Sequence, residues 1–296
     1  MSELLVVLAM LGLVGSLIGT TLMRQQRFYR GATELLRSRE GVRDALAVLA
    51  TDVRGLAPAD TARLLADSAM EFFAAIGTSA VCATDGGWSV GLPAAVTPSG
   101  NTISAFSNEP DTGDLALFYR DSSENGSRWE RHRILSFGSS TFVGGCTLSS
   151  IQGGPAQPAL GLPGFVLSLA SPLSAHVQRG APVRFVRRGR YSLYRSSDGD
   201  WFLGYRRCNA LGVGTCGSIQ PLSGPYRPYS INEAATGLLF SYFDRNGQKL
   251  GRGSSPLELA RVDITARAES RQRIADGTRT RVFGDSATIT IAIRNK

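Results

Sequence analysis

The sequence predicts an α+β protein in which one long N-terminal helix packs on a mainly antiparallel β head. Three observations carry this expectation: an uncharged apolar stretch near the start, an amphipathic helical pattern directly after it, and alternating strand patterns in most of the remainder. We expect residues 1–23 to form a membrane-spanning half of the helix, 24–56 its amphipathic half, and 57–296 the globular head. With 296 residues and 43% hydrophobic content, the chain is long enough to bury a core.

The first stretch, from Leu4 to Met23, carries no charged residue. Twenty helical residues rise about 30 Å, roughly the hydrocarbon thickness of a bilayer, so the stretch predicts one membrane span. Glu3 lies at its start, and a carboxylate at the end of an apolar helix needs a partner. A cleaved secretory signal is disfavoured because the basic n-region, the shorter apolar core and the small-residue cleavage site are missing.

The second stretch, residues 25–56, repeats apolar residues at steps of three, four or seven, which places them on one helical face. They are Phe28, Ala32, Leu35, Leu36, Val42, Leu46, Leu49, Val53 and Leu56. Gly55, with Pro58 beyond it, predicts the end of the helix. Both stretches together predict one helix on the order of 80 Å long.

The head shows the alternation of half-buried antiparallel strands. One hairpin is expected from residues 115–119 and 128–135, and a second from 183–195 and 201–207 around a turn at 196–200. Further strands are expected on both sides of Gly77 and near the end of the chain, at 69–76, 78–83, 237–243, 259–268 and 287–294. Residues 91–110 and the Pro/Gly-rich 150–164 are expected to be loops.

Four cysteines without a C-x-x-C pair favour disulfides over zinc ribbons and thioredoxin-like redox sites. Cys208 and Cys216 flank a short Gly-containing loop and are expected to pair, which leaves Cys82 and Cys146 as the second pair. Disulfides of this kind belong to an oxidising compartment. The alternative is four buried free thiols in a cytosolic protein.

The basic residues after the apolar stretch argue against an oxidising compartment for the head. Arg24, Arg27 and Arg30 would keep the head in the cytoplasm if the positive-inside rule acted alone. A few natural N-terminal residues with their own positive charge, encoded upstream of Met1, would remove this conflict.

Both ends of the chain resemble one protein family. The segment Glu3-Leu-Leu-Val-Val-Leu-Ala-Met-Leu-Gly-Leu, followed by an amphipathic helix with Leu-Arg-Ser-Arg at 36–39 and Ala-Leu-Ala-Val-Leu-Ala-Thr-Asp-Val-Arg at 45–54, resembles the N-terminus of type IV pilins and type II secretion pseudopilins. The likeness is greatest to J-type minor pseudopilins and W-type minor pilins. Residues 238–247 and 257–265 are similar to the C-terminal strands of minor pseudopilins, where a Phe-x-Tyr-x-Asp turn precedes an alternating strand.

The resemblance implies a processed precursor. Members of the family carry a basic leader, which a prepilin peptidase removes after a Gly before it methylates the new N-terminus. The match of Glu3 to the family glutamate implies an assembly role, in which the carboxylate meets the N-terminal amine of a neighbouring subunit. Met1 and Ser2 stand where the family has its leader, so either the start codon lies further upstream or the protein is only pilin-like. We expect an in-frame Gly-Phe and basic residues encoded just upstream of Met1.

The function implied is that of a minor pilin or pseudopilin subunit at the tip of a fibre, without catalysis, metal or cofactor. It would be a single-pass inner-membrane protein with its head in the periplasm or outside the cell. Its partners would be other pilin subunits, the inner membrane and, if a leader exists, prepilin peptidase. The alternatives are a DNA-uptake or adhesive minor pilin and, from another class, a membrane-tethered hydrolase or receptor domain.

Enzyme and metal motifs fit poorly. Gly87-Trp-Ser-Val-Gly91 matches G-x-S-x-G, but two prolines follow where a nucleophile elbow needs a helix. Asp244-Arg-Asn-Gly247 is similar to the start of a calcium loop, yet Ser255 stands where that loop needs Glu. His132 and His176 are scattered and are expected to be polar surface residues.

The second hairpin concentrates positive charge. The chain has a net charge of +8, carried almost entirely by arginine, because Lys249 and Lys296 are its only lysines. Arginines interleaved with Tyr191 and Tyr194 could bind DNA on a sheet surface. The alternative is a solvated sheet face or a subunit interface. The arginines of this basic patch are Arg184, Arg187, Arg188, Arg190, Arg206 and Arg207, with Arg195 at the end of the first strand.

Overall fold

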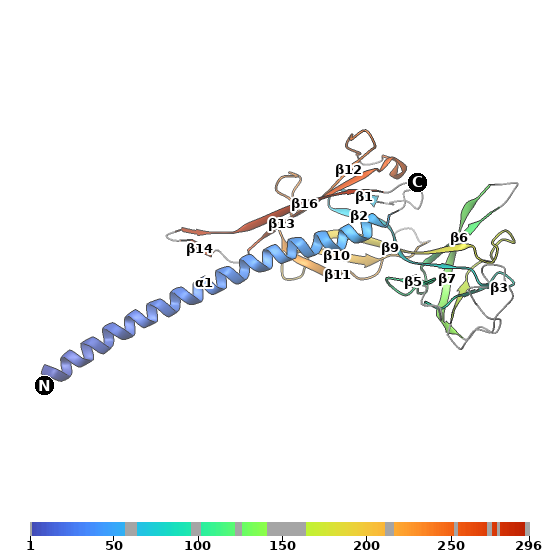
Figure 1. Ribbon diagram of the computed structural model, residues 1–296. Helices are drawn as coiled ribbons and strands as arrows, with labels where there is room; N and C mark the ends of the chain where they lie inside the picture. Colours follow the sequence, from blue (N-terminus) through green and yellow to red (C-terminus); the bar gives the residue numbers. More distant parts are fainter. Residues whose placement is uncertain are drawn as a thin grey trace.

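A computed structural model describes residues 2–56, 64–95, 102–121, 126–140, 164–210, 216–251, 254–270, 274–276 and 279–293. Within these residues it contains one α-helix, α1 (Ser2–Arg54), and a 14-stranded antiparallel sheet. The predicted α+β class is therefore wrong, because strands dominate the described chain and α1 is its single α-helix (Figure 1).

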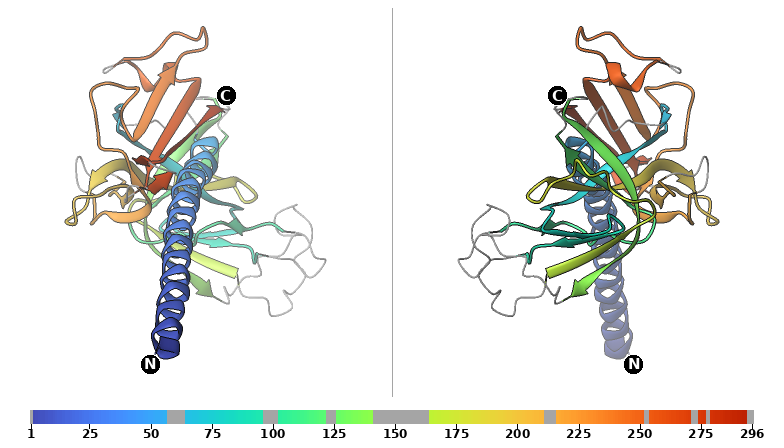
Figure 2. Two further views of the ribbon diagram at one scale, coloured as in Figure 1. Left: turned by 90° about the vertical axis from the view of Figure 1, so that its left-hand side faces the viewer. Right: turned by 90° about the vertical axis from the view of Figure 1, so that its right-hand side faces the viewer.

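Helix α1 ends at Arg54, beside Gly55, as the sequence predicts. Its described side chains fall into two parts. From Met10 to Arg30 nearly every residue is exposed, whereas from Gly31 onward one face is buried. Packing on the head therefore begins at Gly31 and not at Arg24 as predicted, and most of the first part projects beyond the sheet (Figures 1 and 2).

No helix in the described part of the chain combines the length and the hydropathy that a membrane crossing needs. The uncharged stretch with described side chains runs only from Met10 to Met23, and Arg24, Gln25, Gln26 and Arg27 follow it. A span requires about 20 apolar residues. This finding corrects the membrane-spanning assignment of residues 1–23 and the single-pass inner-membrane localisation that rested on it.

The first strands along the chain are β1 (Leu64–Leu65), β2 (Ala69–Ala80), β3 (Ala83–Asp85), β4 (Ser89–Leu92), β5 (Ala105–Phe106), β6 (Leu115–Arg120), β7 (Arg128–Ser140) and β8 (Gly164–Leu169). The later ones are β9 (Pro182–Arg195), β10 (Trp201–Arg207), β11 (Gln220–Tyr226), β12 (Leu238–Phe243), β13 (Arg261–Glu269) and β16 (Gly284–Ala292). A separate hairpin joins β14 (Ile274–Asp276) to β15 (Arg279–Arg281), and a short 3₁₀ helix, η2 (Pro256–Glu258), precedes β13.

The strands follow the order β12-β13-β11-β10-β9-β6-β7-β8-β4-β3, with β16 beside β13 and β2 beside β9. Both predicted hairpins are confirmed, because β6 pairs with β7 and β9 pairs with β10. The three strands predicted near the end of the chain are also present as β12, β13 and β16. Strands β8 and β11 were not predicted. Of the expected loops, 91–110 contains β5, and 150–163 lies outside the described residues.

The break predicted at Gly77 is wrong. Strand β2 continues through Gly77 with a bulge, and Gly77 pairs with Phe106 on one side and Phe185 on the other. A Cβ atom at Gly77 would lie 2.5 Å from the Phe106 ring, so the residue marks a close approach between strands and not a turn.

The head has two lobes, each with its own core. The proximal lobe packs the second half of α1, through residues such as Leu49 and Val53, on β2 and β9–β13 with β16. The distal lobe is built from β3–β8 around Phe118, Ile134 and Phe185 and extends past the C-terminal end of α1 (Figure 1). Strand β9 runs through both lobes and joins them.

Candidate assembly interface

Eleven of the twenty large apolar side chains that are exposed among the described residues belong to the first part of α1, residues 2–30, which we call the arm. Leu13 is 66% exposed and Leu17 59% exposed. Soluble monomers rarely expose so many neighbouring apolar side chains, and surfaces of this kind mark interfaces. Its large exposed apolar residues are Val7, Met10, Leu11, Leu13, Val14, Leu17, Ile18, Leu22, Met23, Phe28 and Tyr29.

The arm has a bulky side and a small side. At about 100° per residue, the large residues between Met10 and Leu22 cover roughly half of the helix circumference. The other half carries Gly12, Gly15, Ser16, Gly19 and Thr20. A Cβ atom added to any of these three glycines would meet nothing within 4 Å, so this side is also open. Large residues on one side and small ones on the other suit close packing between parallel helices.

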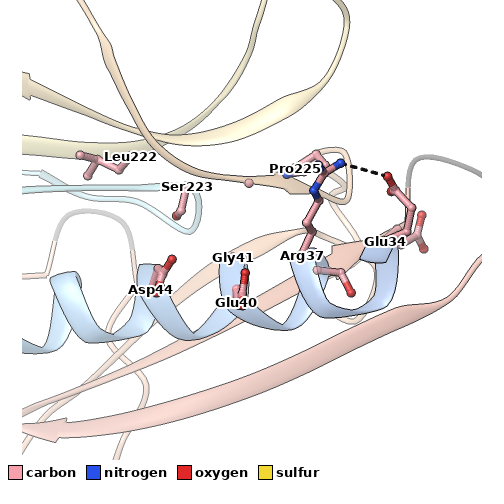
Figure 3. Close-up of a pocket in the computed structure, with 11 residues that line it drawn as sticks. Glu34, Arg37, Glu40, Gly41, Asp44, Leu222, Ser223 and Pro225 are labelled. Atoms are coloured by element: carbon pink, nitrogen blue, oxygen red, sulfur yellow. Dashed lines mark ion pairs between the residues drawn. The ribbon is translucent and has the colours of Figure 1, made fainter. Parts of the chain in front are cut away.

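The arm continues a helix that is firmly fixed to the head. The Tyr226 hydroxyl in β11 donates a 2.6 Å hydrogen bond to the Gly41 carbonyl oxygen. Burial raises the pKa of Tyr226 to about 12. A Cβ atom on Gly41 would lie 3.6 Å from the Gly224 carbonyl oxygen, which shows how closely α1 approaches β11 here (Figure 3).

The other end of α1 is held on β9. The Tyr191 hydroxyl donates a hydrogen bond to the Asp52 carboxylate, and the Tyr191 ring stacks on Phe72 with 5.8 Å between ring centroids. Burial, together with the Asp52 charge, raises the pKa of Tyr191 well above its ordinary value. The packed half of α1 is therefore anchored at both ends, and the direction of the arm is fixed by the head.

Glu3, the predicted assembly residue, belongs to α1, but its side chain lies outside the described part of the structure. Its pairing with a neighbouring N-terminus stays a prediction. The arm that carries it projects away from the head (Figure 1).

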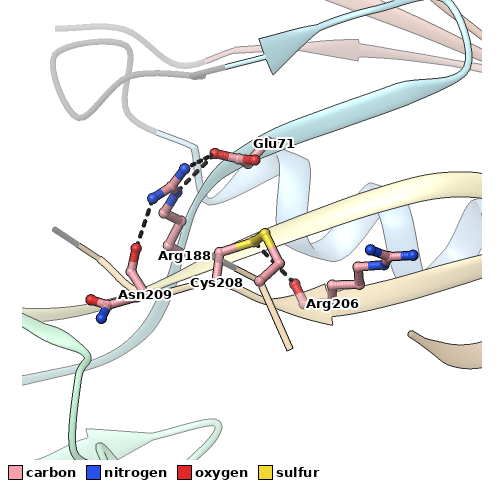
Figure 4. Close-up of a disulfide and its surroundings, with 6 residues drawn as sticks. Glu71, Arg188, Arg206, Cys208 and Asn209 are labelled. Carbon is pink, nitrogen blue, oxygen red and sulfur yellow. Dashed lines mark hydrogen bonds and ion pairs between the residues drawn. A yellow bond between two sulfur atoms is a disulfide. The ribbon is translucent and has the colours of Figure 1, made fainter. Parts of the chain in front are cut away.

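The disulfide between Cys208 and Cys216 is confirmed (Figure 4). Beside it, the Arg188 guanidinium donates to the Glu71 carboxylate at 2.5 and 2.8 Å and to the Asn209 carbonyl oxygen at 2.7 Å. Both charged side chains are buried, so the carbonyl that follows Cys208 completes the partners of a buried ion pair.

The second predicted disulfide cannot be placed, because Cys146 lies outside the described residues. Cys82 is buried, and none of the described cysteines is free. Glu71 lies close to both sulfur atoms of the first disulfide, but sulfurs joined to each other are not thiolate ligands, so this group is not a metal site.

The predicted basic patch is largely occupied by partners within the chain. Arg187 donates to both carboxylate oxygens of the buried Asp114, and Arg207 donates to Asp111 and Asp114. The hydrogen bond with Asp114 raises the pKa of Arg187, and the hydrogen bond from Arg207 lowers the pKa of Asp111. Arg184 lies over the Trp129 ring, 4.6 Å from its centroid.

These arrangements weaken the DNA-binding hypothesis. Arg187, Arg188 and Arg207 are neutralised by carboxylates, and Arg190 and Arg206 are half-buried. The electrostatic attraction to phosphates depends on arginines whose charge is available. Sequence reasoning missed the acidic partners because Asp111 and Asp114 lie far from the hairpin in the chain.

A polar cluster around His132 was also missed. His132 Nε2 lies 2.7 Å from Glu130 Oε1, and Nδ1 lies 2.9 Å from Ser171 Oγ and 3.1 Å from the Ser171 carbonyl oxygen. Glu130 also accepts hydrogen bonds from the Ser174 amide at 2.8 Å and from its hydroxyl at 2.6 Å. His132 is buried, contrary to its predicted surface position, and the cluster fastens the chain after β8 onto β7.

The G-x-S-x-G match does not form a nucleophile elbow, because Ser89 begins β4 where the elbow would begin a helix. The Asp244 carboxylate accepts hydrogen bonds from the backbone of Asn246 and Gln248, which makes this segment a plain turn, as expected. His176 is exposed between β8 and β9.

The comparisons with known proteins identify no relative: no protein-family model, no curated protein and no solved structure matches the chain.

Proposed function

We propose that the protein is a subunit of a pilin-like fibre and assembles by packing its arm against the arms of neighbouring subunits. The single observation that carries this proposal is the arm itself: a straight continuation of an anchored helix, with an apolar surface that nothing in the described chain covers. A helix with so many exposed large apolar side chains is stabilised when other apolar groups cover them.

The energetics favour association. Burial of one Leu- or Met-sized side chain contributes about 1.5–3 kcal/mol. Burial of half a dozen such residues of the arm therefore contributes roughly 10 kcal/mol or more, which is comparable to the cost of fixing two chains relative to each other. Because several neighbours can surround one arm, a bundle of arms offsets this cost better than a pair does.

The pilin-type reading is supported by the sequence at both ends. Glu3 followed by the apolar stretch provides the resemblance at the N-terminus, and residues 238–247 and 257–265, which include β12 and part of β13, provide the resemblance to the C-terminal strands of minor pseudopilins. In this proposal the head is a structural module without catalysis. The placement at the tip, and the choice between a secretion and a pilus system, stay predictions.

The proposal is tested by Leu17→Asp in the full-length chain. Two copies with different affinity tags are co-expressed, and the amount of one that co-purifies with the other is measured. A buried aspartate loses the leucine contacts and carries an unpaired charge, so co-purification should fall at least tenfold.

Ile231→Asp is the matched control, because Ile231 is an apolar residue on the head that is 90% exposed. This variant should co-purify like the wild type. Equal co-purification of wild type and Leu17→Asp would refute assembly through the arm.

A further inference from the structure

Charge is unevenly distributed along α1. Arg24, Arg27 and Arg30 follow the apolar stretch of the arm, are exposed, and form no ion pair with any described carboxylate. We call these three residues the arginine band. Their positive charge is not paired with any carboxylate of the described head.

A groove of about 410 Å³ lies further along the helix, between the packed half of α1 and β11 (Figure 3). Its charged lining residues are one arginine, Arg37, and four acids, Glu34, Glu40, Asp44 and Glu269. We call it the acidic groove. Glu34 and Glu269 have partners within the chain, in Arg37 at 3.6 Å and Arg227 at 2.6 Å. Glu40 and Asp44 are exposed and form no ion pair with any described base.

The arginine band does not pair with Glu40 or Asp44 of its own chain. Arg27 and Glu40 are thirteen residues apart on one continuous helix, which is about 20 Å. At about 100° per residue, Arg27 and Arg24 also point away from the centre of the groove by roughly 75° and 135°. Arg30 points along the groove, but it lies ten residues, about 15 Å, from Glu40. The band therefore lies at a different height from Glu40 and Asp44, and two of its three arginines face another direction.

We propose that the arginine band of one copy of this chain docks in the acidic groove of the next copy, and that this contact sets the stagger between subunits at about 20 Å. The inference rests on the proposed function, since it adds a register to the packing of the arms. Apolar packing alone allows neighbouring helices to be shifted along their axes by many different distances. Charge complementarity favours one of these shifts and penalises the others.

The contact joins two different surfaces. Such a contact closes into a ring only when successive copies are not shifted along the axis, so a shift of about 20 Å makes it continue from copy to copy and generates an open filament. Because Arg24 and Arg27 face a different direction from the groove, their entry into the groove of the next copy requires a rotation of successive copies about the filament axis. A second copy of the chain therefore supplies positive charge that complements the acidic groove, and it supplies this charge on a helix that can lie alongside α1.

The test exchanges the two charges in full-length chains. The band variant carries Arg24→Glu and Arg27→Glu, and the groove variant carries Glu40→Arg and Asp44→Arg. Each variant places like charges opposite one another in its own filament, so the co-purification of two tagged copies at low salt should fall about tenfold. The loss should shrink as salt is added.

The decisive measurement mixes the two variants. The glutamates of the band variant then meet the arginines of the groove variant, and the unchanged arginine band of the groove variant meets the unchanged acidic groove. Co-purification should therefore return to near the wild-type level, and a chain that carries all four substitutions should also associate with itself.

Wild-type association of either variant alone, or a mixture no better than the single variants, would overturn the proposed register. Leu17→Asp separates this result from a failure of the proposed function. If Leu17→Asp abolishes association while the charge exchanges have no effect, the arm interface stands and the register is wrong. If Leu17→Asp also has no effect, or the wild type does not associate, both are wrong.

Discussion

The Tyr226 hydroxyl and the Gly41 carbonyl oxygen are joined by a 2.6 Å hydrogen bond that ties β11 to the packed half of α1. Ser223 lies 2.7 Å from the same hydroxyl, so the phenol is held from two sides. The contact connects the sheet to the arm, because α1 is one continuous helix.

Tyr226→Phe should lower the free energy of unfolding of the full-length chain by about 1–2 kcal/mol, since the hydrogen bonds with the Gly41 carbonyl oxygen and with Ser223 are lost while the ring packing is kept. Urea unfolding followed by circular dichroism measures this change. Tyr229→Phe is the matched control, because the Tyr229 hydroxyl bonds to Asp67 at an exposed site and should contribute less. Equal losses in both variants would contradict a special role for the contact with Gly41.

Arg188→Met should destabilise the chain by about 3–5 kcal/mol, because it leaves the Glu71 carboxylate buried without its cation. The double variant Glu71→Leu/Arg188→Met removes both charges and should recover most of that loss. Urea unfolding of the two single variants and the double variant gives the coupling free energy. Additive losses would show that the two side chains do not act as a pair.

Replacement of Cys208 and Cys216 together by Ala should lower the free energy of unfolding by about 2–3 kcal/mol, because the short loop between them is no longer closed in the unfolded chain. The variant should also lose part of the contribution of Arg188, whose partner carbonyl belongs to Asn209. Combining the cysteine replacements with Arg188→Met should therefore give a loss smaller than the sum. A strictly additive result would separate the disulfide from the ion pair.

Stability should fall in acid partly through Glu130. Burial raises the pKa of Glu130, but the hydrogen bonds from the Ser174 hydroxyl and amide and from His132 outweigh it, so the pKa lies below its ordinary 4.5. A carboxyl with a lower pKa in the folded state stabilises the protein fully above about pH 4.5, and this contribution disappears as the pH falls through the folded value.

Glu130→Gln should therefore show a weaker loss of unfolding free energy between neutral pH and acid than the wild type. The measurement is urea unfolding at a series of pH values. Glu109→Gln, at an exposed glutamate, should follow the wild-type curve. Identical pH dependence in Glu130→Gln and the wild type would show that this carboxyl does not contribute.

The parts of the fold that depend on local pattern were predictable. The end of α1 at Arg54 follows from Gly55 with Pro58 beyond it, and the β9–β10 hairpin follows from alternation around a Gly-containing turn. Strand β11 was missed because Gln220–Tyr226 contains two prolines and a glycine, which normally exclude a strand. It pairs with β10 through an irregular register that no local pattern reveals.

The balance between helix and sheet, and the reach of the arm, were misjudged for a different reason. The amphipathic pattern from Gln25 onward does not show where the sheet begins to cover the helix, and packing starts only at Gly31. The carboxylates that pair with Arg187 and Arg207 come from a segment distant in the chain, so composition alone suggested a basic surface where the fold builds ion pairs. Ser171, which contacts His132, is also distant in the chain.

The measurement that tests the central claim most directly is the mass of the purified full-length wild-type chain in solution, determined by sedimentation over a range of concentrations. Assembly through the arm predicts species much larger than the 31.5 kDa chain, growing with concentration, and reduced to the single-chain mass by Leu17→Asp. A wild-type chain that stays at 31.5 kDa at every concentration would contradict the claim.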